Sequence, residues 1–221
     1  MRAPDSAASA VSPSRSASTF SATRSSPLRL PNITLGIVLT LIVVVGQIVT
    51  QAIDFGLFQL RIGLLNSNSH TSIFGAASLA AQALAALAAM GRSRASRWSA
   101  GWIVVAALTG LLLVVRAGFA FDALLLLGPV ALLFVLLWYL TSHDPGPART
   151  VVRVGLAALV FSYVVHAFGP HVVAALGYAG NTWPYQVKGM LKHSAELAGW
   201  LLVAIGVFQA RPRTGPPVSE L

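Results

Sequence analysis

The residues best suited to chemistry lie near the C-terminus, where a carboxylate interrupts an otherwise apolar stretch. Glu196 follows Lys192 by four residues, so the two side chains share one face of a helix and can pair. An ionised side chain inside a membrane costs free energy unless it is paired or faces a cavity. Glu196 is therefore either neutralised, by Lys192 or by protonation, or it belongs to a proton, metal or ligand site.

Histidines can join this group. His193 directly follows Lys192, and His166 lies a little over one helical turn before the end of the preceding apolar stretch. If the two stretches form antiparallel helices, His166 comes near the depth of Glu196, and a His–Glu hydrogen bond between helices is reasonable. The alternative is that His166 is a packing residue whose hydrogen bonds are satisfied elsewhere.

Metal and haem sites are open alternatives for the same residues. Imidazole and carboxylate suit zinc or iron, so His70, His166, His193 and Glu196 could ligate a divalent metal. His70 and His166 could instead hold a haem between two helices. No two of them have the fixed spacing of a metal motif, and His70 can simply stand at the start of a helix. The sequence therefore predicts no cofactor.

Arg116 is the remaining charged residue of interest, because it stands close to Asp122 at a short turn. A surface ion pair with Asp122 is the simpler interpretation, and an ion pair with Glu196 is the alternative. No nucleophile elbow, phosphate loop or dinucleotide fingerprint occurs, so no catalytic residue is assigned. The candidate polar pocket consists of six residues: Glu196, His166, Lys192, His70, Arg116 and His193.

The elements that carry these residues must lie in a membrane. Of the 221 residues, 56% are hydrophobic and 10% are charged, and the mean hydropathy is +0.75. Soluble proteins contain about 25% charged residues, so one water-soluble core could not hide this much apolar surface. These residues include no cysteine, which excludes disulfides, iron–sulfur clusters and thiolate zinc sites within them.

Apolar segments long enough to cross a bilayer occur six times, which predicts an all-α membrane protein with a six-helix transmembrane bundle. We expect the second segment, which is rich in Ala, to pack among other helices, and Gly169-Pro170 to end the fifth. The transmembrane domain covers 31–213, between a disordered tail, 1–30, and a short polar tail, 214–221. The expected spans are about 33–53, 71–90, 99–115, 122–140, 151–168 and 188–210.

Basic residues give the bundle a direction. With the N-terminus in the cytoplasm, the inner segments hold eleven of the 15 basic residues and the outer segments hold Arg61, Arg116, Lys188 and Lys192. Cytoplasmic loops of membrane proteins are enriched in Lys and Arg. We therefore expect both termini in the cytoplasm and the polar pocket toward the outer side. The net charge of +9 then reflects topology, and no nucleic-acid partner is expected.

Two short stretches resemble a family of six-span bacterial membrane proteins, of actinobacterial type, that has no assigned activity. One is Asn66-Ser67-Asn68-Ser69-His70-Thr71-Ser72-Ile73-Phe74-Gly75, which leads into the Ala-rich segment. The other is Lys192-His193-Ser194-Ala195-Glu196-Leu197-Ala198-Gly199-Trp200 in the last segment. The resemblance implies a multi-pass architecture and transfers no catalytic residue.

The sequence thus favours an integral protein of a bacterial inner (plasma) membrane, which acts as an accessory, sensor or binding protein with an outward-facing polar pocket. Its expected partners are the lipid bilayer and other membrane subunits or further copies of itself. The alternatives are a membrane-embedded metal- or haem-dependent enzyme and a small transporter. Broken helices and midplane charges, which mark transporters, are not evident in the sequence.

Overall fold

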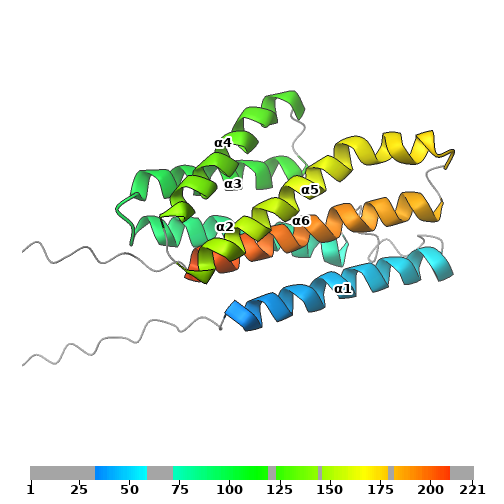
Figure 1. Ribbon diagram of the computed structural model, residues 1–221, viewed down its shortest axis with the longest axis horizontal. Helices are drawn as coiled ribbons and strands as arrows, with labels where there is room; N and C mark the ends of the chain where they lie inside the picture. Colours follow the sequence, from blue (N-terminus) through cyan, green and yellow to red (C-terminus); the bar gives the residue numbers. More distant parts are fainter. Residues whose placement is uncertain (1–32, 59–71, 119–122, 144–145, 179–181, 210–221) are drawn as a thin grey trace, which may run out of the picture.

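A computed structural model describes residues 33–58, 72–118, 123–143, 146–178 and 182–209. These residues form six helices and no strand, as Figure 1 shows. The expected all-α, six-helix architecture is confirmed. The N-terminal tail, 1–30, lies outside the described residues. The helices are α1 (Ile33–Phe58), α2 (Ile73–Ser93), α3 (Ser99–Arg116), α4 (Ala123–Ser142), α5 (Pro147–Ala175) and α6 (Trp183–Gln209).

Length and composition make the chain a multi-pass membrane protein. Within the described residues, α1, α2, α3, α5 and α6 are each long and apolar enough to cross a bilayer, and Gly128–Ser142 of α4 is a shorter apolar stretch. Large hydrophobic side chains are exposed along α1, among them Leu39, Ile42 and Val45. Exposed apolar surface of this kind needs lipid as its solvent.

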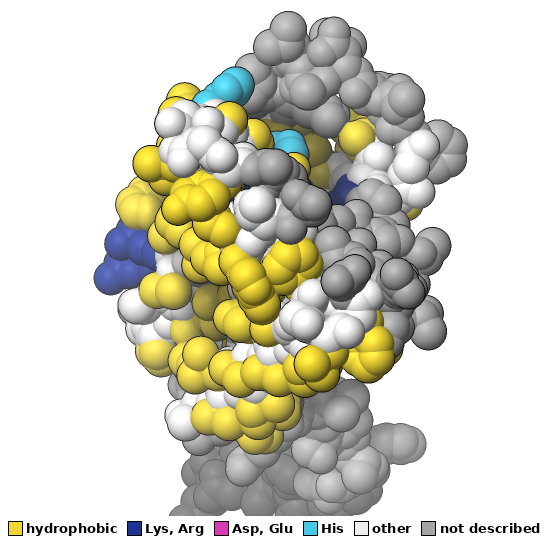
Figure 2. All heavy atoms as spheres, turned by 90° about the vertical axis from the view of Figure 1, so that its right-hand side faces the viewer, with side chains coloured by type: hydrophobic (Ala, Val, Ile, Leu, Met, Phe, Trp, Pro, Cys, Tyr) yellow, Lys and Arg dark blue, Asp and Glu magenta, His cyan; other side chains and the backbone are white. Residues whose placement is uncertain are grey.

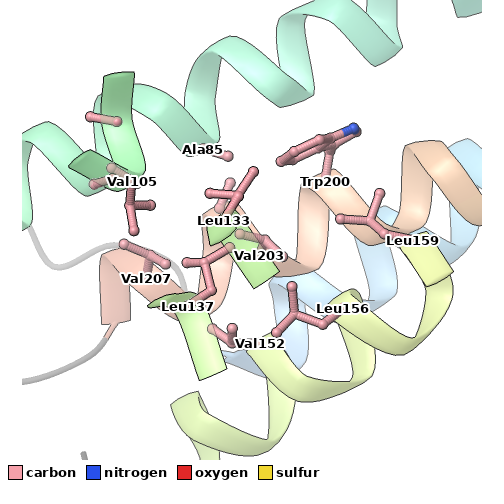
Figure 3. Packing of buried hydrophobic residues seen from close by; sticks show 14 of the residues in the cluster. Ala85, Val105, Leu133, Leu137, Val152, Leu156, Leu159, Trp200, Val203 and Val207 are labelled. Carbon is pink, nitrogen blue, oxygen red and sulfur yellow. The ribbon is translucent and has the colours of Figure 1, made fainter. Parts of the chain in front are cut away.

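Helix α6 is central to the bundle, because it packs against α1, α2 and α5. Helix α3 packs on α2, and α4 bridges α3 and α5. The buried core lies where α2 to α6 meet, and Figure 3 shows that side chains from all five helices interdigitate there. Its labelled members are Ala85, Val105, Leu133, Leu137, Val152, Leu156, Leu159, Trp200, Val203 and Val207.

Glycines let α5 and α6 approach until their backbones touch. A Cβ at Gly155 would lie 2.9 Å from the Gly199 carbonyl oxygen and 3.0 Å from the Val203 nitrogen. A Cβ at Gly199 would lie 2.6 Å from Leu159 Cγ. Small residues at such positions are the usual means of close helix packing in membranes, where no hydrophobic force drives helices together. This contact fixes the position of α6, and therefore of Glu196.

Three helices, α1, α5 and α6, extend at least four residues further than the expected spans. Helix α5 continues through Gly169-Pro170 to Ala175 instead of stopping at Phe168. Pro170 removes only one backbone donor, that for the His166 carbonyl, and membrane helices tolerate this loss. Gly169 meanwhile leaves room for the Lys188 side chain, which a Cβ there would meet at 2.7 Å. The helix therefore stays packed on α6 beyond the proline.

An aromatic contact accompanies the other two extensions. Helix α1 runs to Phe58 and α6 begins at Trp183, each beyond its expected limit. The rings of Phe55 and Trp183 meet edge to face with their centroids 4.7 Å apart, which joins these two helix ends. As a result, α1, α5 and α6 reach beyond α2 and α3 at one end of the bundle, as seen at the right of Figure 1.

That end of the molecule has a mostly apolar surface. Figure 2, which faces it, shows hydrophobic side chains over most of the described surface, with small patches of cationic and His side chains. We call it the site end, because the polar groups described below lie toward it. The opposite end, where α2 and α4 stop and α3 and α5 begin, carries Arg92, Arg94, Arg97, Arg149 and Arg153; we call it the arginine end.

The contact between α5 and α6 can be tested with one added methyl group. We expect Gly155→Ala to lower the free energy of unfolding by about 1–3 kcal/mol, since the methyl group meets backbone atoms that cannot move aside. Thermal unfolding in mild detergent measures the change. Gly110→Ala in α3 is the control, because nothing lies within 4 Å of its added Cβ. Equal midpoints for the two variants would contradict the close contact.

Candidate functional site

A cavity of about 300 Å³ lies between α2, α3, α5 and α6. Part of its wall is apolar, with Leu112, Leu159 and Trp200 among its residues. The rest is polar and holds most of the charged side chains of the site end. Its polar lining consists of Gln82, Arg116, Ser162, Tyr163, His166, Lys192, His193 and Glu196.

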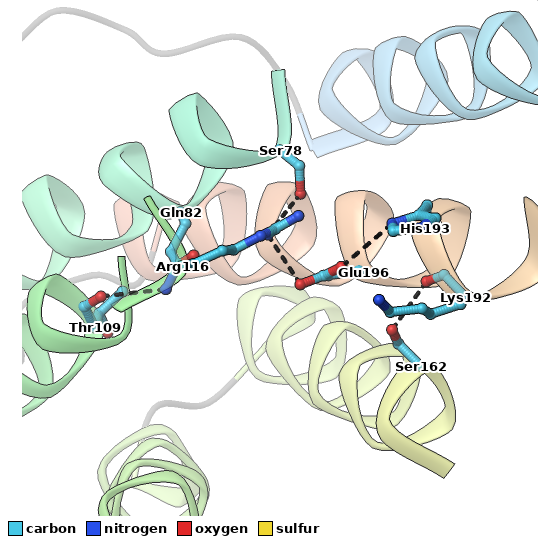
Figure 4. Close-up of polar contacts among 8 residues, drawn as sticks. All are labelled: Ser78, Gln82, Thr109, Arg116, Ser162, Lys192, His193 and Glu196. Atoms are coloured by element: carbon cyan, nitrogen blue, oxygen red, sulfur yellow. Dashed lines mark hydrogen bonds and ion pairs between the residues drawn. The ribbon is translucent and has the colours of Figure 1, made fainter. Parts of the chain in front are cut away.

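An ion pair crosses the cavity between α3 and α6. Arg116 Nη1 lies 2.9 Å from Glu196 Oε1, and the two side chains are 17% and 19% exposed. The same nitrogen donates to Ser78 Oγ on α2 at 2.9 Å. His193 Nδ1 lies 3.8 Å from Glu196 Oε2. Figure 4 shows the Arg116 side chain reaching past α2 toward Glu196, so one guanidinium links three helices.

Glu196 stands at the midpoint of α6, with thirteen residues between it and each end of the helix. At 1.5 Å per residue it is about 20 Å from either end. The sequence places it nearer the outer end, because the expected span begins at Lys188 and not at Trp183. A charge within a membrane-spanning helix must be paired or face a polar cavity, and Glu196 does both.

On α2, the residues at the cavity are spaced about one helical turn apart. Ser72 caps α2, its Oγ accepting a hydrogen bond from the Gly75 nitrogen at 2.9 Å. Gly75, which lines the cavity, has no side chain to fill it. Ser78 and Gln82 follow on the same face, and Gln82 Nε2 donates to the Thr109 carbonyl at 3.3 Å, which ties α2 to α3.

The α5 wall brings hydroxyl and imidazole groups. Ser162 Oγ donates to the Lys192 carbonyl at 2.9 Å, so it fixes α5 against α6 at the level of the cavity. Tyr163 and His166 lie one turn apart on the same helix and both line the cavity. Since Pro170 has no N–H, the carbonyl of His166 also lacks its helical donor. The cavity wall on α5 therefore offers a hydroxyl group and an imidazole for hydrogen bonding.

The structure brings five of the six predicted pocket residues to this cavity: Glu196, His166, Lys192, Arg116 and His193. The sixth, His70, lies outside the described residues, as does Asp122. Arg116 makes the ion pair with Glu196 that the sequence offered as the alternative to Asp122. In the part of the chain that the structure describes, no three His, Asp or Glu side chains come together as metal ligands.

Sequence reasoning missed Ser78, Ser162 and Tyr163. Their signals are weak, because each is a single polar residue in an apolar helix. Ser78 lies one turn before Gln82, and Tyr163 lies one turn before His166. A helical-wheel comparison could have grouped them by face. It could not have shown which faces meet.

A polar stripe on α1 was also missed. Gln47, Gln51 and Asp54 are spaced so that they share one helix face, and all three are at most 1% exposed. Helix α1 packs antiparallel on α6, since a Cβ at Gly36 would contact Ile205 and one at Gly56 would contact Trp183. The stripe therefore adds polar groups at the site end.

No protein-family model matches the chain, and no curated protein or solved structure matches it either. The interpretation of the cavity therefore depends on its own geometry. That geometry consists of a partly buried ion pair, a second cation, several hydrogen-bonding groups and apolar side chains.

A double-mutant cycle tests the ion pair. We expect Arg116→Gln and Glu196→Gln each to destabilise the protein, because each removes the charged partner of the other side chain. The double variant should be more stable than the sum of the two changes predicts, by about 1–2 kcal/mol. Reversible unfolding in mixed micelles measures these free energies. The control combines Arg94→Gln with Glu196→Gln. Their changes in the free energy of unfolding should add, since Arg94 caps the other end of α2. If the changes at Arg116 and Glu196 added equally well, the ion pair would contribute nothing to stability.

Proposed function

We propose that this membrane protein binds a small anionic ligand in the cavity between α2, α3, α5 and α6. The observation that carries the proposal is the charge of the cavity lining, which includes Arg116 and Lys192 but only one carboxylate, Glu196. Glu196 is already in contact with Arg116 at 2.9 Å. Lys192 thus remains as a surplus positive charge.

The surplus positive charge of Lys192 is unfavourable because the helices lie in a membrane. A cation in a low-dielectric environment is unfavourable unless an anion or water compensates it. A bound carboxylate, phosphate or similar group would neutralise Lys192 and make the cavity electrically balanced. The attraction is also stronger there than in water, because the surrounding dielectric constant is lower.

Hydrogen-bond donors beside Lys192 can hold the oxygen atoms of a bound anion. An arginine carries five N–H donors, and the contacts of Arg116 with Ser78 and Glu196 both use Nη1. The guanidinium can therefore also hold a ligand oxygen. Tyr163 and His166 add a hydroxyl and an imidazole from α5. Together these groups surround one small anion from α3, α5 and α6.

The apolar wall limits the kind of anion. Leu112, Leu159 and Trp200 line the same cavity, and ligand sites of this type combine apolar walls with a few polar groups that fix orientation. The supported ligand is thus an organic anion with an apolar part.

We also propose that the protein lies in a bacterial inner membrane with both termini in the cytoplasm, so that the cavity opens outward. The distribution of arginines supports this orientation, because five of them lie at the arginine end, as the positive-inside rule requires of the cytoplasmic side. A soluble anion from outside the cell, or a partner subunit that presents one, would then reach the cavity from the site end.

Anion binding can be tested by ligand-dependent stabilisation. We expect at least one of phosphate, sulfate, acetate and butyrate to raise the unfolding midpoint of the purified protein above that in sodium chloride of equal ionic strength. A ligand at a hundred times its Kd adds about 2.7 kcal/mol to the stability of the folded state. Lys192→Gln should abolish this response, because it removes the surplus charge.

Lys188→Gln is the matched control for that experiment. Lys188 lies one turn before Lys192, but its Nζ packs 3.9 Å from the centroid of the Tyr185 ring and outside the described cavity lining. The two variants have the same net charge, so Lys188→Gln should keep the response to the anion. Equal responses from the two variants, or no response in the unmodified protein, would refute the proposal.

Orientation is tested with reporter fusions. Fusions after Arg97 and Arg149 should report a cytoplasmic location, and a fusion after Tyr178 should report the outer side, because the first two lie at the arginine end and the third follows α5 at the site end. A phosphatase and a fluorescent reporter at each position give independent signals. A cytoplasmic signal after Tyr178 would reverse the proposed direction of the cavity.

A further inference from the structure

A second hollow lies on the outside of the bundle, between α4 and α5. It is a groove of about 640 Å³ with almost entirely apolar walls. Helices α4 and α5 are joined at the arginine end and diverge from that junction (Figure 1). Exposed side chains line the groove, including Val135, Trp138, Tyr139 and Val160. In a membrane, this surface faces the hydrocarbon chains of lipids.

One cation stands at the end of this groove. The Arg153 guanidinium carbon lies 4.3 Å from the centroid of the Trp138 ring, and Nη2 donates to Ser142 Oγ at 3.2 Å. Its buried Nε has no hydrogen-bond partner in the described part of the chain. Arg153 is therefore held in place by neutral neighbours and keeps its positive charge uncompensated by them.

Aromatic side chains mark the depth of this cation. Trp98, Tyr139 and His143 form a cluster with ring centroids 4.8 to 5.9 Å apart, beside the same end of the groove. Trp and Tyr prefer the region where hydrocarbon meets lipid headgroups. The groove thus runs from the headgroup level, at Arg153, into the hydrocarbon layer.

We propose that this groove binds an anionic phospholipid, with the phosphate on Arg153 and an acyl chain between α4 and α5. Charge complementarity supports a lipid over a second copy of the chain. Neighbouring copies in the same orientation would place arginine ends side by side, whereas the acids of the described residues, Asp54 and Glu196, lie toward the site end. Arginine also holds phosphate oxygens with two parallel hydrogen bonds.

The proposal is tested by lipid retention on the full-length protein. The protein is purified in mild detergent with equal amounts of dioleoyl phosphatidylglycerol and dioleoyl phosphatidylcholine, and bound lipid is measured by native mass spectrometry. We expect preferential retention of the phosphatidylglycerol. Arg153→Gln should reduce it about tenfold or more, as expected for the loss of a charge-assisted hydrogen bond. Arg94→Gln, at the same end but outside the groove, should leave it unchanged.

A second variant separates the lipid from a free anion. Ala157→Phe fills the groove at an exposed position and leaves Arg153 in place. It should also reduce phosphatidylglycerol retention, because the acyl chain loses its site. Soluble glycerol 3-phosphate should not displace phosphatidylglycerol from the unmodified protein. The proposal would be overturned if Ala157→Phe left lipid retention unchanged, or if glycerol 3-phosphate competed with the lipid. It would also be overturned if Ala157→Phe abolished a dimer without changing the amount of bound lipid.

Discussion

The cost of placing a charge in hydrocarbon governs the arrangement of this protein. Glu196 lies halfway along α6, a position where an unpaired carboxylate would be strongly unfavourable. Its contact with Arg116 therefore constrains where α3 may end, because the guanidinium must reach the middle of α6. The additional bond from Arg116 to Ser78 extends the same constraint to α2. Three helices are thus positioned by one pair of charges, and the cavity is the space that remains beside them.

Close packing between α5 and α6 supplies the opposite wall. Gly155 and Gly199 allow the two backbones to touch, and Ser162 then comes within hydrogen-bonding distance of the Lys192 carbonyl. This bond engages the backbone of Lys192 and leaves its ammonium group for the cavity. Apolar contact and polar function are therefore coupled, because a wider separation of α5 and α6 would move Tyr163 and His166 away from the charges.

The sequence predicted the helices better than their ends or their contacts. Long apolar runs identify six helices because each must satisfy its own backbone in lipid. The ends were harder to predict, since Gly169-Pro170 stops many helices, whereas here α5 continues through it to Ala175. Periodicity placed Lys192 and Glu196 on one helix face. It could not choose between cations for Glu196, since Arg116 lies on another helix and only tertiary packing brings it close.

The two ends of the bundle use arginine in different ways. At the site end, the charge of Arg116 is matched by a carboxylate from the protein itself, so that charge cannot be the surplus that draws a ligand. At the arginine end, Arg153 is surrounded by an indole ring and a hydroxyl, so its counter-charge must come from outside the described residues. A membrane supplies such charge in lipid phosphates at its surface but not at its centre. An arginine that contacts Glu196 thus has its partner within the protein, whereas an arginine at the membrane surface can take a lipid partner.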